Sequence, residues 1–201
     1  MITKLYSTKD EWLADRKGKI GGSTLSDIVV KRGTGEKIGF YQIIADRIAQ
    51  DPDEENAMER GTRLEEEAIE KVSSILGKEI DTSLVSWARE DNPKITVSPD
   101  GFIDETEAVE IKCLGTAKHI EAIVTNKMPS EYEFQRLQYF IVNDNLKTLY
   151  FVLYDPRMPE KHQIKMFTIN REDIEEDIET YKVYQEEKLS KIEDIINTLT
   201  F

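Results

Sequence analysis

Residues 97–113 read V-S-P-D-G-F-I-D-E-T-E-A-V-E-I-K-C, a stretch in which short apolar runs alternate with turn residues. The apolar runs at residues 95–97 and 108–111 flank these turn signals, which predicts two adjacent strands joined by tight connections. In the second run, Glu110 and Lys112 alternate with apolar side chains. A strand would therefore carry Glu110 and Lys112 on one face and the apolar side chains on the other.

The polar side chains of this strand pair form a candidate metal site. Asp100 follows a proline at the end of the first run, so it is expected to lie near Glu110 and Lys112. Like charges are costly to bury unless a cation lies between them, and carboxylate oxygens are the ligands that Mg2+ prefers. We therefore expect Asp100 and Glu110 to hold Mg2+, with Lys112 orienting or activating a bound water.

Length and charge limit the class of protein. The chain has 201 residues, of which 39% are hydrophobic and 33% charged, so it can bury one sizeable core and is predicted to form a single domain over residues 1–201. Its net charge of -13 argues against a protein that coats nucleic acid with its whole surface. A local basic channel is compatible with this net charge, because the charges are unevenly distributed. Basic residues outnumber acidic ones in residues 1–40, and acidic residues outnumber basic ones in residues 171–201.

Cysteine usage and hydropathy exclude further classes. Cys113 is the single cysteine, which excludes an internal disulfide and any site with four cysteine ligands, including an iron–sulfur cluster. The sequence has no apolar run long enough to span a bilayer and no signal-peptide pattern. We therefore expect a soluble, intracellular protein with no membrane partner.

A basic, glycine-rich loop at residues 16–23 follows a short helix predicted from residue 8 onward. Glycine lets the backbone approach a ligand, and the helix that begins after the loop offers unpaired N–H groups, so Arg16 and Ser23 could hold a phosphate. The alternative is an ordinary helix cap with solvated lysines. The motif alone favours the cap.

Two helices are predicted before the central strands, at residues 38–49 and 57–76. Ile43, Ile44 and Ile48 form the apolar stripe of the first, and Gly77 ends the second. The stripe of the second helix runs from Ala57 to Ile75 and includes Glu65, and a carboxylate on an inward face needs a partner. An ion pair with Arg63 or a neighbouring helix and a metal shared with Asp100 and Glu110 account for it equally well.

The second half of the chain is predicted to contain two more helices, two strands and a helical tail. The helices cover residues 117–126, with Lys118 and His119, and residues 131–142, capped by Ser130; the strands cover 149–154 and 163–169, and the tail covers 171–200. Gln135 and Gln138 lie beside aromatic residues. The two glutamines and their aromatic neighbours could contact a nucleotide, or the glutamines could form the polar edge of an amphipathic helix. The sequence has no internal repeat.

Taken together, these features resemble the PD-(D/E)xK nuclease superfamily and, within it, the phage lambda exonuclease branch with the YqaJ-type viral recombinases. The resemblance covers nearly the whole chain, and its combination of motifs is specific although no single motif is. The matching motifs are Arg16-x-Gly18-x-Ile20-x-x-Ser23, Gly61-x-x-x-Glu65, Ser98-Pro99-Asp100-Gly101, Glu110-Ile111-Lys112-Cys113, Gln138-Tyr139 and Tyr154-Asp155-Pro156-Arg157-Met158.

The resemblance implies an α/β, three-layer restriction-endonuclease-like fold with a mixed central sheet flanked by helices. It also implies a role for each site residue. Asp100, Glu110 and the carbonyl of Ile111 would hold the catalytic metal, Glu65 would support one of two Mg2+ ions with Mn2+ as a substitute, and Lys112 would activate the attacking water. Arg16, Ser23, Ser98 and Gln135 would bind a terminal 5′-phosphate, Gln138 is the alternative to Gln135, and Lys118 stands where the family has an arginine near the scissile strand.

The implied function is that of a Mg2+-dependent 5′-3′ exodeoxyribonuclease of the alkaline exonuclease type. Such an enzyme digests linear double-stranded DNA from a 5′-phosphorylated end and leaves 3′ single strands for an annealing protein in phage-type recombination. A homotrimeric ring around a central DNA channel is implied as well, in the cytoplasm of a bacterial host and encoded by a phage or prophage. The alternatives are a restriction or repair endonuclease on the same core and a non-catalytic DNA-binding module.

Overall fold

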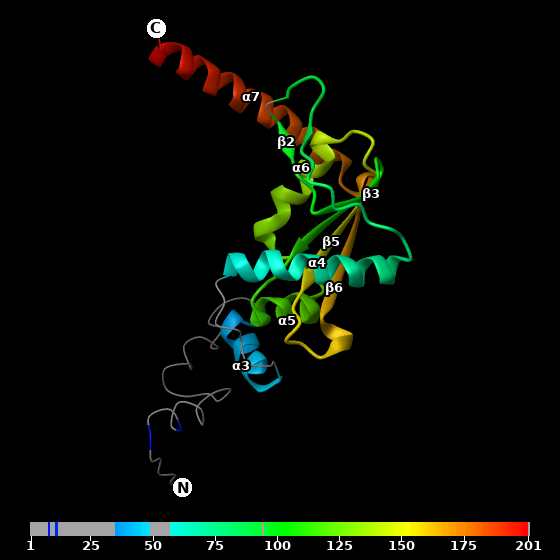
Figure 1. Ribbon diagram of the computed structural model, residues 1–201. Coiled ribbons are helices and arrows are strands. Elements are labelled where there is room, and N and C mark those ends of the chain that lie inside the picture. Colours follow the sequence, from blue (N-terminus) through cyan, green and yellow to red (C-terminus); the bar gives the residue numbers. More distant parts are fainter. Residues whose placement is uncertain (1–7, 9–10, 12–34, 49–56, 94, 201) are drawn as a thin grey trace. The chain divides into compact units, whose positions relative to one another are not determined.

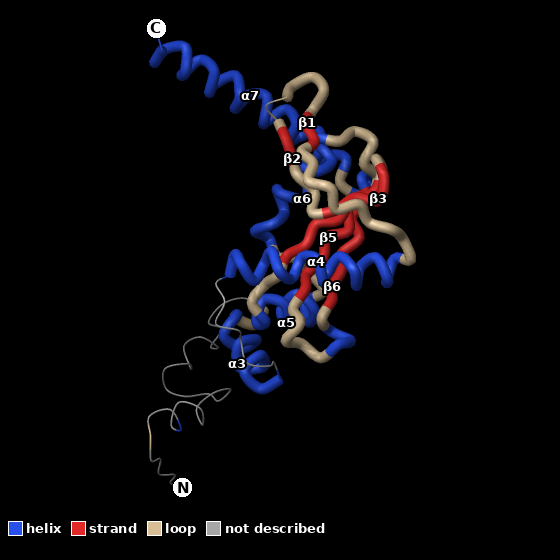
Figure 2. Tube along the Cα trace, viewed as in Figure 1, coloured by secondary structure: helices blue, strands red, loops and turns tan. Residues whose placement is uncertain are grey.

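A computed structural model describes residues 8, 11, 35–48, 57–93 and 95–200 (Figure 1). Its helices are α3 (Ile38–Ile48), α4 (Ala57–Leu76), α5 (Thr116–Thr125), α6 (Glu133–Val142) and α7 (Glu175–Thr200). Its strands are β1 (Trp87–Ala88), β2 (Thr96–Val97), β3 (Gly101–Asp104), β4 (Glu107–Lys112), β5 (Thr148–Tyr154) and β6 (Ile164–Asn170), and Figure 2 distinguishes them from the helices. Short 3-10 turns cover Ser130–Tyr132, Glu160–His162 and Arg171–Asp173.

The predicted glycine-rich loop with Arg16 and Ser23 lies outside the described residues. The helix predicted from residue 8 is described at two positions only, Thr8 and Glu11. The N–H of Glu11 donates to Thr8 Oγ1 (3.2 Å), and the N–H of Thr8 donates to a carboxylate oxygen of Glu11 (3.3 Å). This reciprocal pair is the capping box of a helix start.

The central sheet is mixed, with the strand order β3-β4-β5-β6. β3 and β4 are antiparallel and pair Gly101 with Val109 and Phe102 with Ala108, followed by an irregularity before Asp104. The prediction that residues 95–97 pair with residues 108–111 is wrong. Residues 96–97 instead form β2, which pairs with β1 in a separate two-stranded sheet. The reason is that the chain turns at Pro99 and Asp100 and forms a further strand that begins at Gly101.

The chain divides into two compact units. The first contains the described residues of Met1–Gly61, together with Cys113–Lys127 and Leu153–Lys165. Its core joins α3 and α5, and consists of Tyr41, Ala45, Ala117, Ile120 and Met158, with Ile44 packed against it. Ile48, predicted on the apolar stripe of α3, is 48% exposed, because α3 presents the face of Tyr41 and Ala45 to α5 instead.

The second unit contains Thr62–Lys112, Met128–Val152 and the described residues of Met166–Phe201. Its buried side chains come from β4, β5, α4, α6 and α7, and include Val109, Ile111, Leu149, Phe151, Leu64, Ala68, Val72, Leu137, Phe140 and Ile178. α4 ends at Leu76, and Gly77 follows with a φ of +64°, as predicted for a glycine at a helix stop. Ile75 is exposed, so the buried stripe of α4 ends one turn before the helix does.

α6 is held in place at its C-terminal end by Arg171. The guanidinium donates to the carbonyl of Phe140 (2.6 Å) and Asn143 (2.7 Å) through Nη2, and to that of Leu146 (2.8 Å) through Nε. A cation at this end of a helix also interacts favourably with the helix dipole. Because α6 carries Gln135 and Tyr139, Arg171 fixes the helix that supplies both side chains.

The predicted start of this helix is wrong. Ser130 does not cap α6, which begins at Glu133 after a 3-10 turn and has no side-chain cap. Pro129 holds an extended backbone, and the carbonyl of Ser130 is engaged by the N–H of Glu133. The hydroxyl of Ser130 is therefore too early in the chain to reach the first free N–H groups of α6.

Among the described residues, no helix is long and apolar enough to cross a membrane.

Candidate active site

Glu110 is the centre of the site. It lies on β4 with 1% of its surface exposed, and its carboxylate accepts three hydrogen bonds. Lys112 Nζ (2.5 Å) and Gln135 Nε2 (2.6 Å) both contact Oε1, and the hydroxyl of Tyr139 donates to Oε2. Each carboxylate oxygen has two lone pairs, so Oε2 keeps one acceptor position for a further partner.

Asp100 is held against the same strand. Its Oδ2 accepts a hydrogen bond from the backbone N–H of Ile111 (2.7 Å), the residue that follows Glu110. The neighbouring Gly101 permits this approach, because a Cβ there would lie 2.6 Å from Ile80 Cγ2 and 3.2 Å from Ile69 Cδ1. No side chain larger than hydrogen fits at this position without moving its neighbours. The second carboxylate oxygen of Asp100 has no hydrogen bond within the described part of the chain.

The site carries more negative than positive charge. Burial raises the pKa of Asp100, Glu110 and Glu65, and the charge of Asp100 raises the pKa of Glu110 and Glu65 further. Burial alone would lower the pKa of Lys112, but the charges of Glu110 and Asp100 outweigh it and raise that pKa. Three carboxylates thus share one ammonium ion. Such an excess favours the binding of a cation.

The donor set fits Mg2+ chemically, because it consists of carboxylate oxygens. A ready ligand cage is nevertheless absent from the described residues, where no three His, Cys, Asp or Glu side chains are arranged to hold a metal ion. The carboxylate of Glu110 is turned toward its three hydrogen-bond donors, and that of Asp100 toward the N–H of Ile111. Rotation of these two carboxylates would direct their oxygens at one ion, so the donor set fits Mg2+.

The other predicted site residues that the structure describes differ in their contacts and exposure. Gln135 contacts Glu110, whereas Gln138 donates to the carbonyl of Thr96 (3.0 Å) and accepts from Gln185 (2.5 Å). The side chain of Ser98 is exposed. Lys118 is exposed in the first turn of α5 and belongs to the first unit, and Arg16 and Ser23 lie outside the described residues. Their roles stay predictions.

Tyr139 belongs to the cluster around Glu110 but is not among the site residues that the sequence predicts. It is fully buried, and its hydroxyl also lies 3.3 Å from the carbonyl of Ser98. Burial and then the charge of Glu110 raise the pKa of Tyr139, so its hydroxyl keeps its proton. The signal available in the sequence was the spacing from Gln135, since residues four apart share one face of a helix. Tyr132 is a further neighbour, with Lys112 Nζ 5.6 Å from its ring centroid.

The raised pKa of Glu65 predicts that this carboxylate destabilises the protein in the absence of metal. A carboxyl group whose pKa is raised by folding contributes stability below its unfolded pKa of about 4.3, and that contribution is lost as the pH rises through the folded pKa. We therefore expect Glu65→Gln to raise the Tm in chelator at about pH 8, by at most about 2–4 °C, because solvent screens the partly exposed carboxylate. The gain should vanish near pH 4.

Thermal melts in chelator and in Mg2+ at both pH values would check this expectation. Glu66→Gln is the matched control, because Glu66 is exposed on the same helix. If Glu65 supports a metal, Mg2+ should also raise the Tm of the wild type more than that of Glu65→Gln. A lower Tm for Glu65→Gln in chelator would contradict the assignment of Glu65 to the charge excess.

Comparison with known proteins agrees with this fold. The chain is similar to LHK-Exo in complex with dAMP, with 28% identity and a TM-score of 0.60 over 96% of this chain and 98% of that chain. It is also similar to an alkaline exonuclease, LHK-Exo, from Laribacter hongkongensis, with 26% identity and a TM-score of 0.56 over 95% and 100% of the two chains. No curated protein matches the sequence.

The predicted α/β fold is confirmed by this similarity, and the likeness to the LHK-Exo structures identifies the class of protein as a nuclease. The model of the YqaJ-like viral recombinase domain matches residues 11–145. The chain belongs to that family, which is the branch that the sequence motifs indicated.

Proposed function

We propose that the protein is a Mg2+-dependent exodeoxyribonuclease that digests linear double-stranded DNA from a 5′-phosphorylated end in the 5′ to 3′ direction. The observation that carries the proposal is the cluster of Asp100, Glu110 and Lys112 on the β3–β4 pair, in a chain similar over 96% of its length to LHK-Exo. A partly buried lysine bonded to a buried carboxylate suits phosphodiester hydrolysis better than packing.

Asp100 and Glu110 would hold the Mg2+ together with the carbonyl of Ile111, and Glu65 would support a second ion. When bound, the metal supplies Lewis-acid chemistry and a water of lowered pKa. Lys112 is the group that the chain itself adds. Because the charges of Glu110 and Asp100 raise its pKa, Lys112 is an ammonium ion that can orient the attacking water and neutralise charge on the phosphate.

Recognition of the DNA end is assigned to residues that the family resemblance supplies. Arg16, Ser23, Ser98 and Gln135 would bind the 5′-phosphate, with Gln138 as the alternative to Gln135. Lys118 would contact a phosphate near the scissile bond, where its point charge lacks the fork of an arginine. Mn2+ would substitute for Mg2+, since both accept carboxylate ligands.

The same proposal extends to the assembly and its setting. We propose a single nuclease domain that forms a homotrimer and delivers 3′ single strands to an annealing protein in the cytoplasm of a bacterial host. The charge distribution supports a ring, because only the DNA channel needs to be basic and an acidic exterior limits unproductive contacts. Light scattering would test the trimer.

The activity is tested with linear duplexes bearing either 5′-phosphate or 5′-hydroxyl ends, beside nicked and closed circular DNA. We expect Mg2+ and Mn2+ to support digestion of the phosphorylated linear duplex, and chelator to abolish it. Closed circles should resist digestion, since they offer no end. Cutting of closed circles would instead identify an endonuclease, and binding without any cutting would identify a non-catalytic DNA-binding module.

A further inference from the structure

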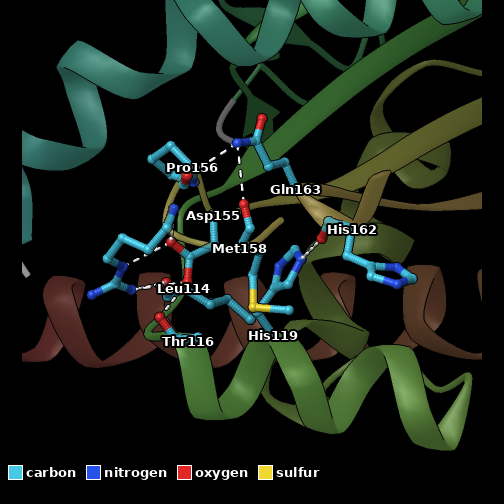
Figure 3. Close-up of polar contacts among 9 residues, drawn as sticks. Leu114, Thr116, His119, Asp155, Pro156, Met158, His162 and Gln163 are labelled. Carbon is cyan, nitrogen blue, oxygen red and sulfur yellow. Dashed lines mark hydrogen bonds and ion pairs between the residues drawn. The ribbon is translucent and has the colours of Figure 1, made fainter. Parts of the chain in front are cut away.

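The segment after β5 forms a buried polar cluster within the first unit. Asp155 is fully buried, and its carboxylate accepts hydrogen bonds from Thr116 Oγ1 (2.5 Å), Arg157 Nε (2.8 Å) and Arg157 Nη2 (3.0 Å) (Figure 3). The backbone N–H of Arg157 donates to it as well (3.2 Å). This cluster belongs to the Tyr154–Met158 motif, which the proposed nuclease chemistry does not use.

Arg157 extends the cluster to the connection between β4 and α5. Its Nη2 also donates to the carbonyl of Leu114 (3.4 Å), which is two residues after Lys112 in the chain. Asp155 in turn holds Thr116, the first residue of α5. The carboxylate and the guanidinium therefore fix both ends of the three-residue turn from Leu114 to Thr116.

The rest of the loop after β5 is also held by hydrogen bonds, both to α5 and within the loop itself. His119, fully buried in the second turn of α5, contacts the carbonyl of His162 through Nε2 (2.8 Å). Gln163 Nε2 donates to the carbonyls of Pro156 (3.0 Å) and Met158 (3.2 Å), which closes the loop on itself. Figure 3 shows the His119 ring directed at His162, and the Gln163 amide directed at Pro156 and Met158. The loop is thus a rigid support for the start of α5.

A contribution to stability does not by itself explain why the chain buries the ion pair of Asp155 and Arg157. Burial on its own would raise the pKa of Asp155, but the hydrogen bonds of Arg157 and Thr116 outweigh it and hold that pKa below its ordinary range. Buried ion pairs are nevertheless often no more stabilising than apolar side chains of similar volume, because both ions lose hydration. Their best-attested benefit is a single defined conformation. Here the conformation that is defined is that of residues 114–119.

We propose that Asp155 and Arg157 are positioning residues that fix the first turn of α5 and thereby hold Lys118 where it contacts a DNA phosphate. The inference rests on the proposed function. Lys118 is an exposed residue of that first turn, between Thr116 and His119, which the loop fixes on both sides. A shift of the turn would move the ammonium ion away from the phosphate without changing the charge of the protein.

Arg157→Lys tests the proposal, because it keeps the charge and removes the fork that contacts Asp155 and Leu114 together. For a 5′-phosphorylated linear duplex in Mg2+, we expect KM to rise about tenfold, the scale of one charge-assisted contact, with kcat within about twofold of the wild type. Thr116→Val should act in the same direction. Lys161→Ala is the matched control, since it removes an exposed charge from the same loop and should leave KM unchanged.

A double-mutant cycle with Lys118→Ala separates positioning from general destabilisation. If Arg157 acts through Lys118, Arg157→Lys should change KM by less than about twofold in the Lys118→Ala background. Amide hydrogen exchange should also become faster at residues 114–119 and stay unchanged in β4. An unchanged KM for Arg157→Lys, or equal effects in both backgrounds, would overturn the proposal.

Binding of the same duplex in Ca2+, followed by fluorescence anisotropy, distinguishes this inference from the proposed function. A wild type that binds DNA in Ca2+ but does not cleave it in Mg2+ would refute the nuclease proposal. Weaker binding by Arg157→Lys, again dependent on Lys118, would still support the positioning role. Equal binding by the two proteins would overturn it.

Discussion

Asp100→Asn is expected to lower the rate of DNA hydrolysis by at least about 10²–10³-fold, because it removes the negative charge of a proposed Mg2+ ligand. The fold should be retained. The amide oxygen of asparagine can still accept the hydrogen bond from the N–H of Ile111, which is the contact that holds residue 100 against β4. Hydrolysis of a labelled duplex and thermal melts of both proteins would check these two expectations.

Lys112→Met is expected to have an effect of similar size, because it removes the ammonium ion that contacts Glu110. Lys78 offers a matched control, since it forms an ion pair with Glu107 (2.5 Å) in the same unit. Lys78→Met therefore also breaks a lysine–glutamate pair, but one outside the proposed site, and should leave hydrolysis unchanged. Near-normal hydrolysis by Asp100→Asn or Lys112→Met, with an unchanged Mg2+ requirement, would exclude the assignment of this cluster as the catalytic site.

The strands could be predicted where apolar side chains alternate or run together. β5 and β6 lie within one residue of their predicted bounds at each end, and the alternation around Glu110 agrees with the 2.5 Å contact between that residue and Lys112. The pairing of β1 with β2 could not be predicted, because a two-residue strand has too few side chains to show a period. The prediction includes no strand at Phe102 and Ile103, which lie between the two turn signals and belong to β3.

The candidate site could be predicted in its residue types but not in its hydrogen bonds. Sequence spacing relates neighbours on one strand or helix, such as Glu110 and Lys112. The contact between Tyr139 and Glu110 joins α6 to β4 across 29 positions of the chain, and depends on how the two elements pack. The support of α6 by Arg171 is equally long-range. Side chains that position a catalytic group from another element therefore escape an analysis of local patterns.

Tyr139→Phe is expected to raise the Mg2+ concentration needed for half-maximal hydrolysis by about 10–100-fold, the usual effect of removing a group that orients a metal ligand. The ring is kept, so packing in the core changes little. The lost hydroxyl leaves Oε2 of a buried carboxylate without its donor, which should also lower the free energy of unfolding by about 1–3 kcal/mol. Mg2+ titrations of activity, well below the Tm of both proteins, would separate the two effects.

Tyr150→Phe is the matched control for Tyr139→Phe. The hydroxyl of Tyr150 donates to Glu107 (2.9 Å), so the chain contains a second tyrosine–glutamate pair within the same unit. Removing that hydroxyl should lower stability without changing the Mg2+ requirement. If both variants changed the Mg2+ titration equally, the effect would reflect stability, and Glu110 would lose its assignment as a ligand oriented by Tyr139. A shift confined to Tyr139→Phe would identify its hydroxyl as the group that holds Glu110 in position for the metal.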